Sequence, residues 1–116
     1  MINFNRLLSV DSAKAAKARG YGALNGIHYM APADTSGVNL CPNATAACRA
    51  LCLGKYSGQA SMVADLENGT NSVRESRIAK ARLFMSDREA YLRHLERAIS
   101  RLVKQATSEA LEAVVR

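Results

Sequence analysis

All three cysteines of this chain lie in one short segment, CPNATAACRALC, at Cys41, Cys48 and Cys52. The chain has 116 residues, a length that supports one modest hydrophobic core. Three thiols that meet at one point would therefore fix the path of this segment and much of the fold around it. An odd number of cysteines argues against a disulfide framework, so the spacing C-x6-C-x3-C indicates a shared metal site.

The residues around Cys48 and Cys52 are expected to form a short helix, Ala44–Leu53, because alanine and leucine favour helices and Gly54 can end one. Two residues four apart share a helix face, with Cβ atoms about 5–6 Å apart. A disulfide needs Cβ atoms about 3.5–4.5 Å apart. The two thiols are therefore expected to bind a common group, with Cys41 completing its third side from a loop rich in proline and glycine.

An iron–sulfur cluster fits these ligands best, since thiolates are its usual ligands. Three cysteines suit a [3Fe-4S] cluster, or a [4Fe-4S] cluster whose fourth iron takes another ligand. Arg49 and Lys55 are expected to stabilise the negative charge of the cluster. Two alternatives stay open. Zinc would need a fourth ligand, for which the histidines are His28 and His94, and the thiols could instead pack as small apolar groups.

The cysteine segment lies inside the stretch GYGALNGIHYMAPADTSGVNLCPNATAACRALCLG, and a second stretch, VRESRIAKARLFMSDREAYLRHLERAI, follows it. Both resemble the gene product 88 family of bacteriophage and prophage proteins, and the resemblance extends from about Gly20 to Ile99. It implies that the three cysteines are the ligands of a cluster. Other positions that match the family pattern are Asp34, Arg77, Arg82 and Arg88.

The chain departs from the family pattern in two places. CPNATAAC stands where relatives often have CPWASPGC, so a tryptophan that could shield a cluster is missing. Longer relatives continue past a strand that corresponds to Val114 and Val115. A site completed by such a continuation would be absent here, and the resemblance supplies no settled reaction.

The pattern of apolar and turn residues predicts one mostly α, small α+β domain over residues 1–116. An extended or irregular arm, 1–20, in which SAKAAKARG is compatible with a short helix ending at Gly20, comes first. It leads to a strand within Tyr21–Met30, the loop and the cysteine helix, all within 21–55. A helical scaffold, 56–116, contains two longer packed helices. The first is expected at Thr70–Met85, and a capping box of Ser86 and Glu89 opens the second.

The second long helix has an apolar stripe at helical spacing. The stripe consists of Tyr91, Leu92, Leu95, Ala98, Ile99, Leu102 and Val103. The last residues, TSEALEAVVR, are compatible with an extension of this helix or with a strand, because valine favours strands.

The formal net charge is +6, which permits binding to nucleic acid through the basic helices. Aromatic residues for base stacking are few, and the alternative is a solvated helix face. The sequence contains neither a signal-peptide pattern nor a transmembrane run, so we expect no membrane contact and a cytoplasmic location, in the host cell if the chain is phage-encoded. A monomer and a homodimer are both compatible with the sequence.

We expect a phage-type iron–sulfur protein that acts in electron transfer or redox sensing with a redox partner. One alternative is an enzyme that uses an open iron of the cluster, although the spacing is not the C-x3-C-x2-C of the common radical family. Another is a zinc-stabilised basic module that binds nucleic acid. The sequence shows no catalytic motif such as HExxH, so whether the protein is an enzyme stays open.

Overall fold

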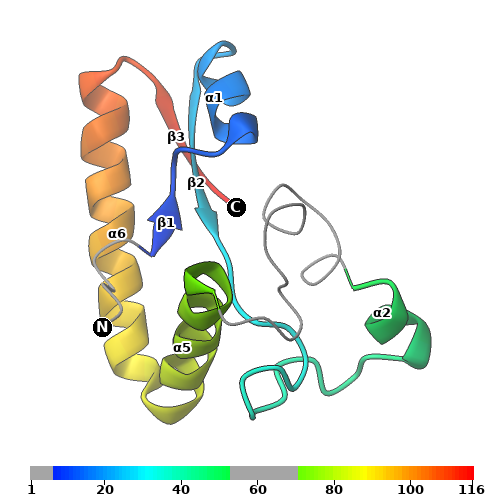
Figure 1. Cartoon of the computed structure of the whole chain (residues 1–116). Helices are drawn as coiled ribbons and strands as arrows, with labels where there is room; N and C mark the ends of the chain where they lie inside the picture. Colours follow the sequence, from blue (N-terminus) through cyan, green and yellow to red (C-terminus); the bar gives the residue numbers. More distant parts are fainter. Residues whose placement is uncertain (1–6, 53–70) are drawn as a thin grey trace. The chain divides into compact units, whose positions relative to one another are not determined.

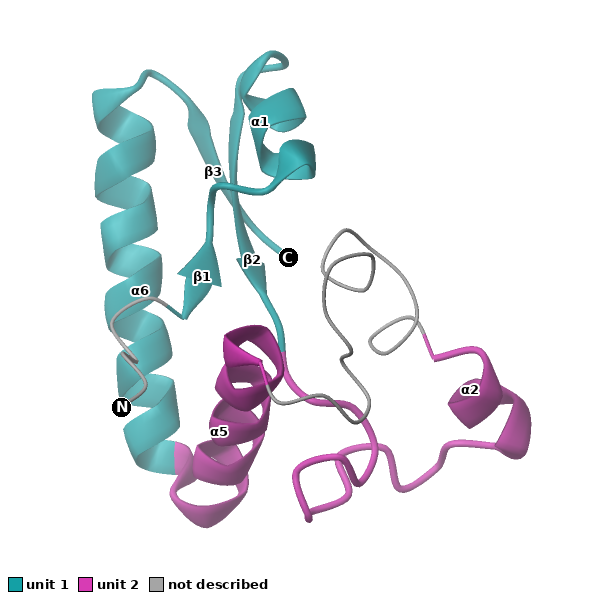
Figure 2. Ribbon diagram, in the orientation of Figure 1, with its two compact units in different colours: residues 1, 3–29, 89–116 teal, residues 2, 30–88 magenta. Residues whose placement is uncertain are grey.

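The computed structural model describes residues 7–52 and 71–116. These residues form two compact units, shown in different colours in Figure 2. The first unit contains the described residues 7–29 and 89–116, and the second contains 30–52 and 71–88. Helices cover more of the described chain than strands do, so the predicted mostly α fold with a small sheet is confirmed.

The first unit is built on a small mixed sheet. Its strands are β1 (Leu8–Ser9), β2 (Ala23–His28) and β3 (Glu112–Val115), with β2 in the centre. β1 pairs with β2 antiparallel, whereas β3 pairs with β2 parallel. A parallel pair needs a long crossover, and here the crossover returns through the long helix α6 (Arg88–Ser108) before β3 begins (Figure 1).

The N-terminal arm contains β1 and the helix α1 (Ala13–Arg19), so the alternative of a short helix ending at Gly20 is confirmed and the irregular arm is wrong. The Ser12 hydroxyl caps α1 by accepting a hydrogen bond from the Ala15 N–H at 3.1 Å, and Gly20 follows its last turn. Gly22 then adopts a φ of 89°, which glycine reaches without strain, and the chain turns into β2. Ala15 is fully buried, and α1 packs against β2.

The core of the first unit lies between β2 and α6. Alternate strand residues share a face of a sheet, and Leu24, Gly26 and His28 of β2 all contact residues of α6. Leu24 packs with Leu102 and Ala106, Gly26 lies against Leu102, and His28 contacts Tyr91. A Cβ added at Gly26 would lie 2.8 Å from Leu102 Cδ2, so this position keeps the strand and the helix in close contact.

The predicted apolar stripe of α6 is only partly buried. Leu92 and Val103 are 49% and 48% exposed, since they lie beside the face that packs on β2. The buried residues of the helix are Tyr91, Ala98, Leu102 and Ala106. The predicted capping box is wrong as well: Ser86 is the last residue of the preceding helix, and Asp87 separates the two helices.

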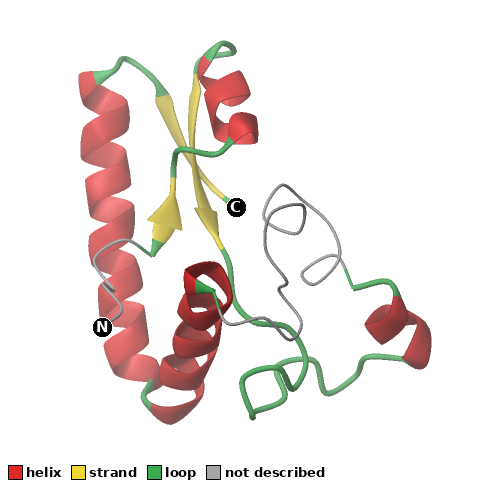
Figure 3. Ribbon diagram, viewed as in Figure 1, coloured by secondary structure: helices red, strands yellow, loops and turns green. Residues whose placement is uncertain are grey.

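The second unit contains two helices, α2 (Ala46–Ala50) and α5 (Ser72–Ser86), and a long loop before α2 (Figure 3). The N-cap residues are Thr45 and Asn71, each with a side-chain oxygen that accepts from the third helical N–H. Loop and helix are joined by two hydrogen bonds. The Ala31 N–H donates to the Arg77 carbonyl at 3.1 Å, and Arg82 Nε donates to the Ser36 carbonyl at 2.7 Å.

Candidate functional site

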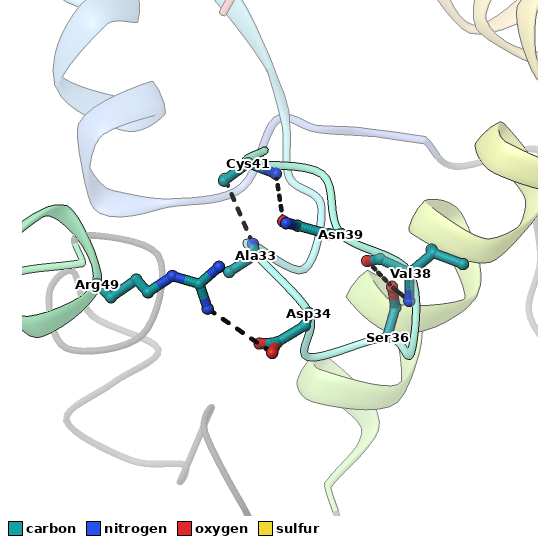
Figure 4. Close-up of polar contacts among 7 residues, drawn as sticks. All are labelled: Ala33, Asp34, Ser36, Val38, Asn39, Cys41 and Arg49. Atoms are coloured by element: carbon teal, nitrogen blue, oxygen red, sulfur yellow. Dashed lines mark hydrogen bonds and ion pairs between the residues drawn. The ribbon is translucent and has the colours of Figure 1, made fainter. Parts of the chain in front are cut away.

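The loop before α2 is ordered by turns of its own backbone. The Thr35 N–H donates to Pro32 O at 3.3 Å, and the Gly37 N–H donates to Asp34 O at 2.9 Å. Gly37 has a φ of 89°, and the Ser36 side chain is 2% exposed and bonds the backbone of Val38 (Figure 4). Asp34 thus closes one of these turns with its backbone carbonyl and not with its carboxylate.

Cys41 lies at the end of this loop, with its sulfur held by the loop itself. The Ala33 N–H donates to Cys41 Sγ at 3.3 Å, and the Cys41 N–H donates to Asn39 Oδ1 at 2.9 Å. A further bond from the Leu40 N–H to Ala33 O, at 2.9 Å, closes the loop around Ala33. Ala33 has a φ of 47°, a left-handed conformation that costs a non-glycine residue about 1–2 kcal/mol. The half-buried Cys41 thus has a fixed amide donor at its sulfur.

Cys48 lies on α2, where Thr45 contacts it twice. The Cys48 N–H donates to Thr45 Oγ1 at 3.1 Å, and the Thr45 hydroxyl donates to Cys48 Sγ, also at 3.1 Å. These hydrogen bonds from Thr45 lower the pKa of the exposed Cys48 thiol, because they favour the thiolate. Thr45 therefore both caps the helix and activates the sulfur.

An ion pair connects the two cysteine-bearing segments. Arg49, next to Cys48, approaches Asp34, next to Ala33, with 3.7 Å between Nη1 and Oδ2 (Figure 4). Both side chains are well exposed, so the pair contributes about 1 kcal/mol at most. Arg49, predicted to stabilise a cluster, follows Cys48 in the sequence, and its guanidinium is directed to Asp34.

Cys52 differs from its predicted position. α2 ends at Ala50, with Leu51 as its C-cap, so Cys52 lies beyond the helix and does not share a helical face with Cys48. The helix has five residues where ten were predicted, and none of the five is buried, so no packed face extends it. Cys52 is half-buried, and all three cysteines are free thiols. Lys55 lies outside the described residues.

The described residues contain no preformed metal site. Within 7–52 and 71–116, no three side chains from histidine, cysteine, aspartate and glutamate lie close enough to hold one ion. Cys41 and Cys48 each have a hydrogen-bond donor at the sulfur, but the structure does not bring the three thiols together. Their role as ligands stays a prediction.

The two histidines belong to the first unit, whereas the cysteines belong to the second. His28 Nε2 shares a hydrogen bond with Tyr91 Oη, and the two rings meet edge to face with centroids 5.8 Å apart. Tyr91 is 1% exposed, and burial raises its pKa to about 12. The structure thus gives His28 a partner in its own unit.

The basic residues of the two long helices have different surroundings. On α5, Arg77 is buried and Arg82 Nε is bonded to the loop, so these two side chains are not part of a freely solvated helix face. Burial, and after it the charge of Arg77, lowers the pKa of Lys80. On α6 the basic residues are exposed, and a hollow of about 310 Å³ is lined by Glu96, Arg97, Ser100, Arg101 and Lys104.

Two features of the site were missed from the sequence. The Ala33 amide gives no sequence signal, because it reaches Cys41 through the loop fold. The Thr45 hydroxyl could have been found, since threonine three residues before Cys48 at the start of a helix is a typical N-cap.

The family model described as Gene product 88 matches residues 5–116, nearly the whole chain. No curated protein and no solved structure matches the chain. In the part of the chain that the structure describes, no helix is long and apolar enough to cross a membrane.

Proposed function

We propose that this chain, which belongs to the gene product 88 family, binds an iron–sulfur cluster through Cys41, Cys48 and Cys52 and acts in electron transfer or redox sensing. The observation that supports the proposal most is the pair of hydrogen bonds to sulfur, from the Ala33 amide and from the Thr45 hydroxyl. Hydrogen bonds to ligand sulfurs stabilise thiolates and tune the reduction potential of such clusters.

The donor set suits this cofactor. All three side chains are thiols within one segment of the second unit, and the Asp34–Arg49 ion pair connects the loop of Cys41 to the helix of Cys48. Cys52 lies two residues beyond the last helical residue of α2, so the helix does not fix the position of its sulfur relative to Cys48. When bound, the cluster supplies one-electron transfer, while Ala33 and Thr45 hold the ligand sulfurs.

A role in electron transfer or sensing is favoured over catalysis by the surroundings of Cys48. This residue is exposed, so one ligand is at the surface of its unit, where a redox partner or an oxidant has access. Among the described residues, the Thr45 hydroxyl is bonded to Cys48 Sγ, and Asp34 and Arg49 are paired with each other. Use of an open iron by an enzyme stays the alternative.

The ligand assignment is tested by anaerobic reconstitution of single variants. Cys41→Ala, Cys48→Ala and Cys52→Ala should each retain less iron and sulfide than the unaltered chain, because each loses one thiolate. His28→Gln and His94→Gln are the matched controls and should retain the full content. Loss of metal from the histidine variants, with zinc in place of iron, would instead support the zinc alternative.

Nucleic acid is a second candidate partner, supported by a specific row of charges. Arg93, Arg97, Arg101 and Lys104 are all exposed and follow one another at intervals of three or four residues on one side of α6. Such a row can follow a phosphate backbone. Binding of short DNA that weakens steeply with salt, and that is lost when Arg93, Arg97 and Lys104 become glutamine, would support it. The control variant replaces the exposed Lys14 and Lys17 of α1 with glutamine. If it loses DNA binding to the same extent, a specific role for α6 is contradicted.

A further inference from the structure

β3 forms an edge of the sheet, and no other described strand pairs with its outer side. On its inner side, the Glu112 N–H donates to Gly22 O and the Arg116 N–H donates to Gly26 O, both at 2.9 Å. Successive residues of a strand direct their backbone groups to opposite sides. The N–H and C=O groups of Ala113 and Val115 therefore point away from β2. Among the described residues, these two make no hydrogen bond outside the β2–β3 ladder.

The side chains of this edge are uncovered too. All four residues of β3 are exposed, including Val114 at 38% and Val115 at 47%. An exposed edge strand with valines and without proline is a template for pairing with another strand. The charged residues at this edge are Glu112, the first residue of β3, and Arg116, which follows its last residue.

We propose that a second copy of this chain pairs antiparallel with β3, with Val114 opposite Val114 of the second copy. In an antiparallel pair, facing residues that direct their backbone groups toward each other exchange two hydrogen bonds. With Val114 at the centre, Ala113 faces Val115 of the second copy and Val115 faces its Ala113. In both pairs, the N–H and C=O groups of the two residues point outward from β2 and can form these hydrogen bonds. In a pairing centred on Ala113, Ala113 faces Ala113 of the second copy, and Val115 faces a position outside β3. In a pairing centred on Val115, Val115 faces Val115 of the second copy, and Ala113 faces a position outside β3.

The charges of Glu112 and Arg116 favour the same register. With Val114 at the centre, Glu112 of each copy lies opposite Arg116 of the other, so two opposite-charge pairs flank the valines. Neither residue forms an ion pair with another described residue. The registers centred on Ala113 and on Val115 do not bring these charges together. Glu112, Val114 and Arg116 also lie on one face of the sheet, so charges and valines can contact each other across the two copies.

Charge variants test the partner and the register together. In Glu112→Arg both flanking pairs of the dimer become Arg–Arg, and in Arg116→Glu both become Glu–Glu. Each variant alone should self-associate about tenfold more weakly than the unaltered chain. When the two variants are mixed, every facing pair is again Arg–Glu, and association should return. Sedimentation velocity over a range of concentrations measures this, on protein purified anaerobically with reductant so that thiols do not cross-link.

Val115→Pro is the complementary variant. It removes an outward N–H without removing a hydrogen bond to β2, so it should abolish self-association while the circular dichroism of the chain stays unchanged. The interface is small, and a weak, concentration-dependent dimer is expected. A chain that is monomeric at every concentration would overturn the proposal. So would self-association that survives Val115→Pro, or variants that fail to associate when mixed.

Discussion

The Thr45 hydroxyl is the smallest feature on which the proposed site depends. It accepts a hydrogen bond from the Cys48 N–H and donates one to Cys48 Sγ. One hydroxyl therefore both caps α2 and favours the thiolate of Cys48. Threonine at an N-cap is common for structural reasons alone. The bond to sulfur adds a chemical effect, because Cys48 is exposed and its thiolate is accessible to reagents.

Thr45→Val should slow the alkylation of Cys48 several-fold at neutral pH in the metal-free protein. The substitution removes both hydrogen bonds, so the pKa of the thiol rises and less thiolate is present. The rate is measured with iodoacetamide and mass spectrometry of the peptide that contains Cys48. Thr45→Ser keeps the hydroxyl and should react like the unaltered chain. An unchanged rate in Thr45→Val would show that Thr45 does not influence the thiol.

Tyr91 should make the stability of the protein fall at high pH. Burial raises its pKa to about 12, whereas an unfolded chain has a tyrosine pKa of about 10. Between these values the unfolded state loses the proton first, so the free energy of unfolding decreases as the pH rises from about 10 to 12. Urea unfolding at several pH values measures this. Tyr91→Phe should remove that part of the pH dependence, and an unchanged slope in this variant would contradict the account.

At the scale of elements, the contact between β2 and α6 depends on Gly26. A Cβ there would lie 2.8 Å from Leu102 Cδ2 and 3.1 Å from Leu8 Cδ1. Both are ends of flexible side chains, so Gly26→Ala should destabilise by about 1–3 kcal/mol through overpacking. Leu102→Ala should cost about 2–5 kcal/mol through the cavity that it leaves.

The double variant Gly26→Ala/Leu102→Ala tests whether these effects arise from one contact. It should be less destabilised than the sum of the single variants, since the added methyl group enters the space that Leu102 vacates. Chemical denaturation of all four proteins measures the coupling. Val103→Ala, on the exposed side of α6, is the control and should change stability by less than about 0.5 kcal/mol. Strict additivity would show that Gly26 and Leu102 do not interact.

Most elements could be predicted from local patterns, and the failures share a cause. The strand within Tyr21–Met30 and the two long helices are confirmed, with ends shifted by a few residues. β1 has only two residues and exists because it pairs with β2, which no local pattern reveals. α2 is shorter than predicted, because its content of alanine and leucine favours a helix without fixing where the helix ends. Since α2 ends at Ala50, Cys52 lies outside it.

For the whole molecule, the sequence identified the candidate ligands and the family but not the environment of the ligands. The family is confirmed over residues 5–116. Spacing along the chain could not predict that the Ala33 amide reaches Cys41, since this contact requires the left-handed backbone at Ala33 and the turns that follow. Nor could it predict that Arg49 pairs with Asp34, which depends on the position of α2 relative to the loop within the second unit.

The most direct test of the central claim is the visible spectrum of the chain purified without oxygen, with iron, sulfide and zinc assayed on the same sample. We predict a brown protein with thiolate-to-iron absorbance, and with iron and sulfide in nearly equal amounts. Removal of the metal with a chelator should bleach the colour and leave three reactive thiols. A colourless protein without iron, even after anaerobic reconstitution with iron and sulfide, would contradict the assignment of Cys41, Cys48 and Cys52 as cluster ligands.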